Sequence, residues 1–453
     1  MTAPTYEKLT APTSGTRVTV SEEGEWTIPD DPIVCLLRGD GIGQDVDGVP
    51  GITTCAVKVL DAAVQKAYGD KRKVHWFDIH AGDVAREMYN PDVKDEEVGK
   101  LSEDDQRKLY LPDDTLKAFE YYQVGLKGPL TTPIGGGFRS INVFLRMYFD
   151  LYACVRPVRF FQGVDAPNKR AHNVNMVIFR ENTEDVYCGI EFKGGSEKAK
   201  QVIGLLKEMG YDVLESSGIG IKPISPERTK RLVRLAVRYA IDRKLPSVTL
   251  MHKGNIMKFT EGAFKDWGYE LATEEFRDAV VTEDEKWNGA DATGKVEIKD
   301  RIADSMFQQI QLRPEEYSVI ATSNLNVDYI SDAAAALTGG IGLAAGANIG
   351  DRAAMFEATH GTAPKYTGKN MANPGAVLLS GVLLLEHMKW DEAAKLVQDA
   401  VEKTFAESES LAKSGSSDKL HVTYDIARQL PGKKAEDGAT SEEFADRIIH
   451  HMG

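Results

Sequence analysis

Short apolar runs alternate along the chain with longer segments of helical spacing, a pattern typical of an α/β protein. Residues 33–37 (Ile-Val-Cys-Leu-Leu) predict a buried strand, and the segment Ile52–Tyr68 predicts a helix. A second helix is expected after Ser225, which is a good capping residue, with Pro226 at the first helical position. Residues 248–251 then form another predicted strand, which leads into His252-Lys-Gly-Asn255.

Two glycine-rich segments test whether this is a dinucleotide-binding Rossmann fold. Residues 39–43 follow a strand, but their spacing is G-x-G-x-G rather than G-x-G-x-x-G, and no acid follows about 20 residues on at a strand end. Residues 340–345 fit G-x-G-x-x-A, but they follow a predicted small-residue helix at 332–337 instead of a strand. We therefore expect an α/β fold that is not a Rossmann fold.

The chain has 453 residues, which is more than one hydrophobic core usually fills, so two or more domains are expected. Residues 1–30 are polar and rich in turn formers, and predict a loose arm. The acidic stretches 92–105 and 283–285 predict surface insertions, and the Gly-, Lys- and Ser-rich stretch 193–224 predicts an excursion from the main body.

Composition excludes several classes of function. With 42% hydrophobic residues, 27% charged residues and a net charge of −14, the chain is typical of a soluble globular protein that does not bind nucleic acid. No apolar run is long enough to span a bilayer, and the acidic N-terminus resembles neither a signal nor a transit peptide. The four cysteines are widely spaced, a pattern typical of proteins whose thiols stay reduced. We expect a cytoplasmic protein without membrane attachment.

A pair of acids follows the apolar strand at 318–322. Asp328 and Asp332 would share one face of a helix that starts near Asp328, and a third acid, Asp304, lies upstream. Carboxylates with positions left for water and substrate oxygens suit magnesium or manganese, which take the same oxygen ligands. Asp-x-x-x-Asp alone is weak evidence, because solvated helix faces often contain it.

Basic and hydroxyl-bearing side chains elsewhere in the chain indicate that this pair of acids belongs to a binding site. Ser140 and Asn142 are expected near a helix start, after a glycine hinge at 135–137, and Arg146 follows about one turn later. Arg156 and Arg180 add two further guanidinium groups. Forked donors of this kind bind carboxylates in pairs, so these residues and the acids predict one site for a polycarboxylate and a metal ion. Lys253 and Tyr187 are candidates for proton transfer, although either could simply be packed.

In this order the motifs resemble the isocitrate/isopropylmalate β-decarboxylating dehydrogenases, and most of all the bacterial-type NADP-dependent isocitrate dehydrogenases. The resemblance covers roughly residues 30–450, and its eight motifs lie at 39–43, 127–132, 139–142, 179–187, 252–255, 324–332, 346–351 and 360–366. It implies metal-dependent oxidative decarboxylation of isocitrate to 2-oxoglutarate with NADP, a step of the tricarboxylic acid cycle.

The resemblance also implies the architecture. The family is homodimeric, with a large and a small domain around a shared sheet and a clasp, and its active sites are shared between subunits. If the domain limits of the family are carried over to this chain, the large domain would span 1–151 and 339–453, the small domain 152–184 and 226–338, and the clasp 185–225.

Residue roles follow from the same resemblance. Ser140, Asn142, Arg146, Arg156 and Arg180 match isocitrate-binding positions, and Tyr187 and Lys253 match the catalytic pair. Asp304, Asp328 and Asp332 match the metal ligands, with Lys253 and Asp304 contributed across the dimer. Thr131 and Asn142 match positions near the nicotinamide. The adenosine half is matched by His360, Gly361, Thr362, Ala363, Lys365, Tyr366, Asn373, Tyr424 and Arg428.

Cofactor choice and alternatives can be weighed on these positions. A 2′-phosphate needs cations and donors, which Lys365, Tyr366, Tyr424 and Arg428 supply, so NADP is expected. Isopropylmalate or homoisocitrate dehydrogenase is the alternative within the family, but the donors Ser140 and Asn142 suit a third carboxylate better than an apolar group. A non-catalytic regulatory subunit would lack metal or proton-transfer residues that are present here. Ser140 also matches a position where some bacterial relatives are phosphorylated by a regulatory kinase.

Overall fold

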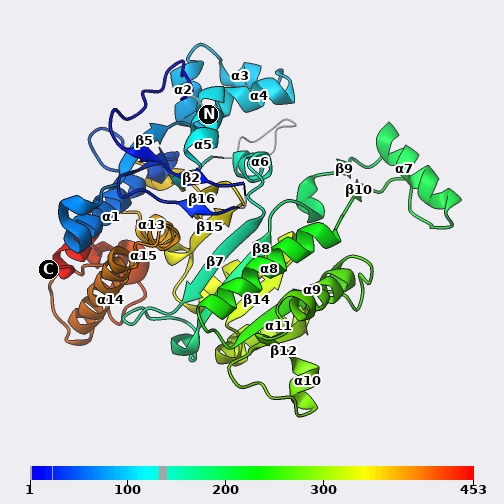
Figure 1. Cartoon of the computed structure of the whole chain (residues 1–453). Coiled ribbons are helices and arrows are strands. Elements are labelled where there is room, and N and C mark those ends of the chain that lie inside the picture. Colours follow the sequence, from blue (N-terminus) through cyan, green and yellow to red (C-terminus); the bar gives the residue numbers. More distant parts are fainter. Residues whose placement is uncertain (1–2, 23, 132–139) are drawn as a thin grey trace. The chain divides into compact units, whose positions relative to one another are not determined.

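The computed structural model describes residues 3–22, 24–131 and 140–453 (Figure 1). The predicted glycine hinge at 135–137 and part of two of the eight motifs lie outside these residues. The described chain forms two compact units. The first comprises Met1–Val177, Ile310–Glu315 and Ser331–Gly453, and the second comprises Ile178–Gln309 and Glu316–Ile330. The domain limits inferred from the resemblance stay a prediction.

Mixed β-sheet forms the centre of the first unit. Its strands lie in the order β1 (Thr16–Arg17), β4 (Pro32–Leu37), β6 (Val124–Lys127), β16 (Ala354–Ala358), β15 (Ala345–Ile349) and β7 (Ala153–Arg159), and β5 (His75–Ile79) also pairs with β4. β4, β6 and β16 are parallel, whereas β15 runs antiparallel to both of its neighbours. The predicted strand at 33–37 is confirmed as β4, and all six of its residues are buried.

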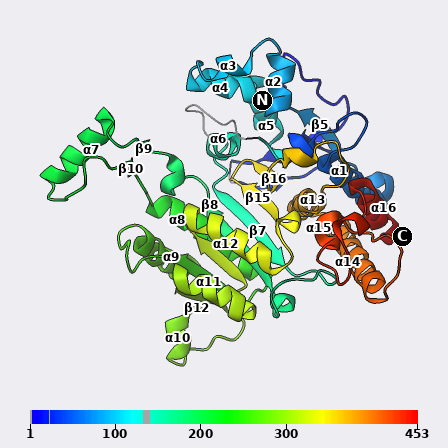
Figure 2. The ribbon, with the colours of Figure 1, turned by 180° about the vertical axis from the view of Figure 1, so that it is seen from behind.

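Helices cover this sheet. The predicted helix is confirmed as α1 (Ile52–Tyr68), which packs against α13 (Gly375–His387), α14 (Asp391–Lys413) and α16 (Ser441–His451). Figure 2 shows α13, α14 and α16 gathered near the C-terminus, with the short α15 (Tyr424–Ala427) beside them. α13 is apolar all round and buried because it lies beneath the other helices. α6 (Ile141–Tyr148) begins directly after Ser140.

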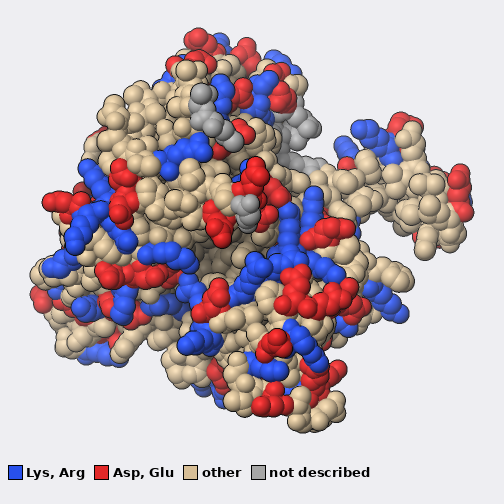
Figure 3. All heavy atoms as spheres, viewed as in Figure 1, with Lys and Arg blue, Asp and Glu red and all other residues tan. Residues whose placement is uncertain are grey.

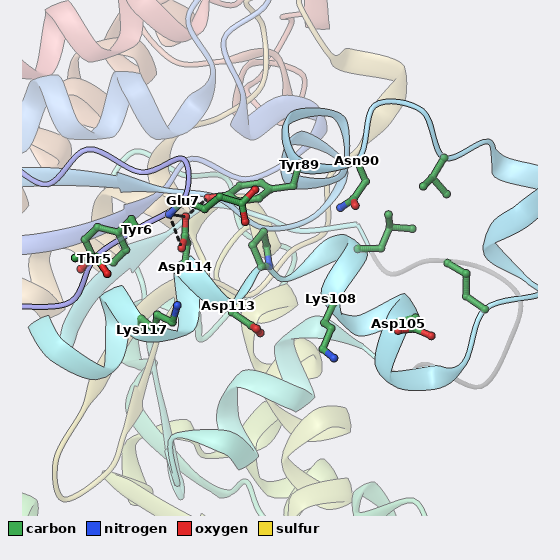
Figure 4. A pocket seen from close by; sticks show the side chains of 14 residues that line it. Thr5, Tyr6, Glu7, Tyr89, Asn90, Asp105, Lys108, Asp113, Asp114 and Lys117 are labelled. Carbon is green, nitrogen blue, oxygen red and sulfur yellow. Dashed lines mark hydrogen bonds between the residues drawn. The ribbon is translucent and has the colours of Figure 1, made fainter.

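The prediction of a loose arm at 1–30 was wrong. Val18 is buried, and the arm contributes strand β1 and the antiparallel pair β2 (Thr19–Val20) and β3 (Trp26–Thr27). The Asp114 carboxylate accepts the backbone N–H of Glu7 at 2.8 Å and of Lys8 at 2.9 Å, and the Tyr89 hydroxyl at 2.8 Å. Figure 4 shows the hydrogen bonds between Glu7 and Asp114, both of which line a pocket of ≈ 730 Å³. These hydrogen bonds hold the arm on the protein surface.

The acidic stretch 92–105 belongs to a small helical region of the first unit. It lies among α2 (Asp83–Tyr89), α3 (Asp95–Val98), α4 (Glu103–Tyr110) and α5 (Asp113–Tyr122). Ser102 caps α4 by accepting the N–H of Asp105 at 3.2 Å, and Arg107 bridges Asp104 and Asp113. The stretch is therefore folded structure whose acids are partly paired.

The second unit contains a parallel sheet with helices. β11 (Ser247–His252) lies between β14 (Val319–Thr322) and β13 (Val296–Ile302), which continues to β12 (Val280–Thr282), while β8 (Asn175–Glu181) follows β14. α8 (Pro226–Asp242) and α9 (Glu261–Glu275) pack on it, and α10 (Glu283–Trp287) and α11 (Ala303–Leu312) follow in the chain. The predicted start of α8 is confirmed, because the Ser225 hydroxyl accepts the N–H of Arg228.

An excursion leaves the second unit between β8 and α8. Figures 1 and 2 both show α7 (Glu197–Glu208) projecting on the antiparallel pair β9 (Glu191–Phe192) and β10 (Ile219–Gly220). Large apolar side chains are exposed on it, among them Leu205, Met209, Tyr211 and Leu214. An apolar surface of this kind is typical of a segment that contacts another chain.

The helix that carries the acid pair starts earlier than predicted. α12 (Asn324–Leu337) begins at Asn324, not near Asp328. Because β14 ends at Thr322 and Asp185 accepts the N–H of Leu325, the first turn forms directly after the strand. Asp328 and Asp332 are therefore one turn apart in the interior of α12, after its first turn.

Surface and hydropathy add two observations. Figure 3 shows lysine and arginine side chains interspersed with acids on the visible faces of both units. Among the described residues, none of the helices combines the length and apolar character needed to cross a bilayer.

Candidate active site

Five of the predicted site residues line one pocket of the first unit, with a volume of ≈ 170 Å³. Asn142 and Arg146 come from successive turns of α6, and Arg156 comes from β7. His360 and Gly361 follow the end of β16, whose residues Glu357 and Ala358 also line the pocket. The structure thus brings together three predicted substrate residues and two predicted cofactor residues from three distant parts of the sequence.

Polar atoms in this pocket lack internal partners. Within the described part of the chain, no hydrogen-bond partner is found for the buried Oδ1 of Asn142 or the buried Nε of Arg156. The Arg156 guanidinium donates a hydrogen bond to the Ser331 hydroxyl at 2.6 Å and lies 3.9 Å from the Asp332 carboxylate. A buried polar group without a partner is costly, so these atoms point to a polar ligand that satisfies them.

Glu357 offsets part of the positive charge of the pocket. Its carboxylate lies 2.6 Å from the Lys127 ammonium and 2.7 Å from the Arg146 guanidinium, and it also accepts the amide of Asn348 at 2.7 Å. The β6–β16 register sets Glu357 opposite Lys127. Burial acts to raise the pKa of Glu357, but the charges of Lys127 and Arg146 outweigh it and hold this pKa well below its usual range. Glu357 is therefore ionised and keeps both cations in place.

Ser140 is the N-cap residue of α6. Its carbonyl accepts the N–H of Phe144, but among the described residues its hydroxyl makes no capping bond. The hydroxyl is therefore not used by the helix itself. Asn142 and Arg146 follow on the same helix, which places the three predicted isocitrate residues within two turns.

A second group forms in the second unit around Arg180. Its side chain is 2% exposed and donates to Asn324 at 2.8 Å and to Asp328 at 2.6 Å. The guanidinium also lies over the Tyr187 ring, 4.8 Å from its centroid, and the Tyr187 hydroxyl donates to Asp328 at 2.7 Å. Burial and this hydrogen bond raise the pKa of Tyr187, so the phenol keeps its proton at neutral pH. One predicted substrate residue, one catalytic residue and one metal ligand thus lie in direct contact.

Lys253 and Asp304 form a separate pair in the same unit. The Lys253 ammonium contacts the Asp304 carboxylate, while the Lys253 backbone N–H donates to Glu261 at 2.9 Å. Asp304 lies at the start of α11 and is 70% exposed. Among the described residues, no cluster of three or more His, Cys, Asp or Glu side chains is placed to hold a metal ion.

The glycine loop at 39–43 packs against the predicted adenosine loop. The N–H of Ile42 donates to the Thr362 carbonyl at 3.0 Å, and a Cβ at Gly41 would lie 2.3 Å from that same oxygen, so only glycine fits there. Ala363 adopts a left-handed φ of 39° at the start of the turn Pro364–Tyr366. Asp40 accepts the N–H of Thr131 at 2.8 Å.

Aromatic stacking joins the residues predicted to read the 2′-phosphate. The rings of Tyr366 and Tyr424 stack with centroids 5.2 Å apart, and the Arg428 guanidinium lies 5.9 Å from the Tyr424 ring. Lys365 is exposed on the same turn as Tyr366. Asn373 donates to Asp425 at 3.0 Å, next to Tyr424. His360 is neutral, because burial lowers its pKa.

Comparison with known proteins decides the family. The family model for isocitrate/isopropylmalate dehydrogenases matches residues 33–430. The chain belongs to this family. It is 49% identical over 451 residues to an isocitrate dehydrogenase [NADP] of Archaeoglobus fulgidus, covering 99% of each chain. It is also 49% identical to the protein of that name from Pseudomonas aeruginosa, covering 99% of this chain and 100% of the relative.

A solved structure agrees with this assignment. The crystal structure of isocitrate dehydrogenase from Methylococcus capsulatus superposes with a TM-score of 0.69 at 32% identity, covering 93% of this chain and 99% of the other. The fold is thus the α/β fold of the isocitrate/isopropylmalate dehydrogenases, as the sequence motifs predicted.

The acids of α12 suit the divalent cation that the family resemblance implies. Asp328 is 40% exposed and Asp332 is 65% exposed, so both carboxylates can reach a solvated cation. Oxygen donors of this type are those that magnesium and manganese prefer. The donor chemistry therefore fits.

Two residues of the pocket escaped the motif analysis. Glu357 received no role, although an acid within the apolar strand Ala354–Ala358 is itself a signal of a buried ion pair. Lys127 was noted within a motif but was assigned no function. It is 2% exposed and also donates to the carbonyl of Gly128 at 3.0 Å. Both residues line the pocket.

Proposed function

We propose that the protein catalyses the NADP-dependent oxidative decarboxylation of isocitrate to 2-oxoglutarate and carbon dioxide. The observation that carries this proposal is the pocket in which Asn142, Arg146 and Arg156 converge beside His360 and Gly361. The relatives named isocitrate dehydrogenase [NADP], at 49% identity over nearly the whole chain, support it.

Substrate binding would use the donors of α6 and the arginines. Arg146 and Arg156 each offer a planar fork that suits a carboxylate, and Asn142 and Ser140 offer smaller donors for a third. Isopropylmalate carries an apolar group where isocitrate has that carboxylate, and would leave these donors unsatisfied. The pocket chemistry therefore favours isocitrate.

Asp328 and Asp332, with Asp304 of a second subunit, would hold magnesium or manganese. When bound, the cation would polarise the substrate hydroxyl and NADP would accept the hydride. Lys253 would take the hydroxyl proton as the general base of the reaction. Tyr187, which keeps its proton at neutral pH, would protonate the carbon that loses carbon dioxide.

A homodimer with shared active sites is part of the proposal. Lys253 and Asp304 contact each other, whereas Tyr187 and Asp328 contact each other through a different hydrogen bond. This division into two pairs supports an arrangement in which each chain lends one pair to its partner. The exposed apolar residues of the excursion around α7 supply a surface for such an association.

NADP rather than NAD is supported by the cationic and hydroxylic groups on one side of the adenosine loop. Lys365 and Arg428 supply positive charge, and the stacked Tyr366 and Tyr424 place two hydroxyls beside them. These four predicted residues include no acid, which is what a bare ribose would need, and the neighbouring Asp425 carboxylate accepts the Asn373 amide. We propose a cytoplasmic enzyme, with Ser140 as a candidate target for a regulatory kinase.

One assay tests the proposed activity. Purified protein is mixed with NADP and magnesium chloride, and the absorbance of NADPH is followed after addition of either isocitrate or isopropylmalate. A rise with isocitrate alone is expected. No rise with isocitrate, from protein that is folded by circular dichroism, would contradict the proposal.

A further inference from the structure

A buried group of three charges in the second unit has no role in the site described above. The Lys222 ammonium lies 2.6 Å from Asp185 and 2.9 Å from Glu261. The side chains of Asp185 and Glu261 are 1% and 0% exposed, and that of Lys222 is 16% exposed. Two buried carboxylates around one lysine would repel each other without that lysine, so the group is held together by Lys222.

Glu261 connects the loop of Lys253 to the helix of Asp328. Its carboxylate accepts the backbone N–H of Lys253 at 2.9 Å and the side-chain amide of Asn326 at 2.7 Å. It also accepts the Ser323 hydroxyl at 2.7 Å, at the end of β14. A single side chain therefore fixes the backbone that presents Lys253 and the first turn of α12.

Asp185 connects the same helix to the segment of Tyr187. One carboxylate oxygen accepts the N–H of Leu325 at 3.0 Å, in the first turn of α12, and the other accepts the N–H of Val186 at 2.6 Å. Asp185 itself has a left-handed φ of 69°, a conformation that is unfavourable for a non-glycine residue and needs support from its surroundings. The bond to Lys222 provides that support, two residues before Tyr187.

We propose that Lys222 is a positioning residue for catalysis: through Glu261 and Asp185 it fixes the three segments that present Asp328 and Tyr187 to the chain's own active site and Lys253 to that of the partner. The inference rests on the proposed function for the roles of those three residues. Lys222 touches none of them, so it acts on their placement and not on the reacting atoms. Misplacement of catalytic groups by about 1 Å can lower a rate by about a hundredfold.

Lys222→Met tests this placement, because it removes the charge while keeping most of the length. We expect kcat for isocitrate to fall by about 10- to 100-fold. KM for isocitrate should change less than kcat, because Asn142, Arg146 and Arg156 lie outside this group and only Arg180 of the predicted substrate residues is bonded to Asn324 and Asp328. Lys222→Arg, which keeps the charge, should restore most of kcat.

A second readout needs neither metal nor cofactor. Hydrogen exchange at the backbone amides of Lys253 and Leu325, which donate to Glu261 and Asp185, should accelerate in Lys222→Met. Lys230→Met is the matched control. Lys230 pairs with Glu270 at 3.0 Å in the same unit but takes no part in this group, so kcat and both exchange rates should stay at wild-type values.

The outcomes separate the two proposals. Wild-type kcat together with wild-type exchange at Lys253 and Leu325 in folded Lys222→Met would overturn the positioning role. If that variant does not fold, Glu261→Gln, of equal shape without the charge, carries the same expectation, and unchanged values in it would overturn the role as well. Absence of isocitrate oxidation in the wild type contradicts the proposed function instead and leaves the exchange result as the test of Lys222.

Discussion

The guanidinium of Arg180 lies 2.6 Å from the carboxylate of Asp328, so a predicted substrate residue and a predicted metal ligand satisfy each other. Arg180 is 2% exposed, and a buried cation needs such a counter-charge. Binding of metal and substrate would therefore be linked. With Asp328 holding the cation, the guanidinium of Arg180 would bind a substrate carboxylate instead.

Asp328→Asn tests the metal site. The change keeps the shape of the side chain and removes the charge that both Arg180 and a cation need. Loss of a residue that only supports a metal ligand typically lowers activity by about 10- to 100-fold, so loss of a ligand itself should lower it by more than about a hundredfold. Steady-state rates against magnesium concentration measure it. Asp284→Asn, at an exposed acid of the same unit, is the control. Wild-type activity that persists in a chelator would show that the acids are only a solvated helix face.

Lys365→Asp combined with Tyr366→Ile tests cofactor selection. The double change removes a cation and a donor and adds repulsion toward a 2′-phosphate. A charge-assisted hydrogen bond contributes about 1.5–3 kcal/mol, so the preference for NADP over NAD should drop by about 10- to 150-fold. The ratio of kcat/KM for the two cofactors is the measurement, with Lys117→Asp as a control on another surface. An unchanged ratio would place the phosphate elsewhere.

Substitutions at Ser140 test the electrostatics of the pocket. Ser140→Asp and Ser140→Glu should block isocitrate binding, because they add a negative charge at the start of α6, close to the anion site. Ser140→Ala should lose only one hydrogen bond, on the order of 1 kcal/mol. Ser140→Asn, neutral and nearly the size of aspartate, separates bulk from charge. Equal isocitrate affinity in the aspartate and asparagine variants would contradict the electrostatic account.

Glu357→Gln tests the buried ion pair. It leaves Lys127, which is 2% exposed, without its counter-charge, so the free energy of unfolding should fall by about 3 kcal/mol. Lys127→Met with Glu357→Gln removes both charges and should lose less than the single change. Urea unfolding of the three proteins measures this. A double variant less stable than the single one would contradict the account.

Asp40 gives a dependence of stability on pH. Burial raises its pKa to about 6 from an unfolded value of 3.8, despite hydrogen bonds from Thr131 and Asp83. Between these values the folded chain holds a proton that the unfolded chain releases. The contribution of Asp40 to stability is therefore greatest below pH 3.8, falls as the pH rises through this window, and is constant above about 6.

The comparison with Asp40→Asn isolates that contribution. The variant cannot titrate at this position, so its melting temperature relative to the wild type should rise from pH 4.5 to pH 6.5. A constant difference over that range would show that Asp40 has an ordinary pKa in the folded protein.

Local patterns accounted for much of the fold. Apolar spacing gave α1 its limits, and Ser225 with Pro226 gave the start of α8, because these signals lie within a few residues of the feature they specify. The ordered motifs gave the family. The arm at 1–30 was mistaken for a loose segment because Asp114, which holds it, lies more than a hundred residues away.

The same limit applies to the site. Arg146 and Arg156 could be predicted as substrate-binding residues because their guanidinium groups have a known preference for carboxylates, which the residue type alone reveals. Glu357 and Glu261 could not be given roles, since each acts through partners brought close only by folding: Glu357 through Lys127 on a neighbouring strand, and Glu261 through Lys222. Hydrogen bonds at long sequence separation leave no local pattern.

The carboxylate of Glu357 determines how the pocket behaves between turnovers. Glu357 offsets one of the two positive charges of Lys127 and Arg146, so both side chains are held in place without a solute while the pocket keeps a net positive charge. Inorganic phosphate or sulfate would meet cations that are already partly neutralised, and each offers a single anionic centre. A tricarboxylate spreads its charge over three arms and can engage α6 and β7 together. Selectivity against the abundant small anions of a cell would thus depend on Glu357, an acid that the proposed substrate need not touch.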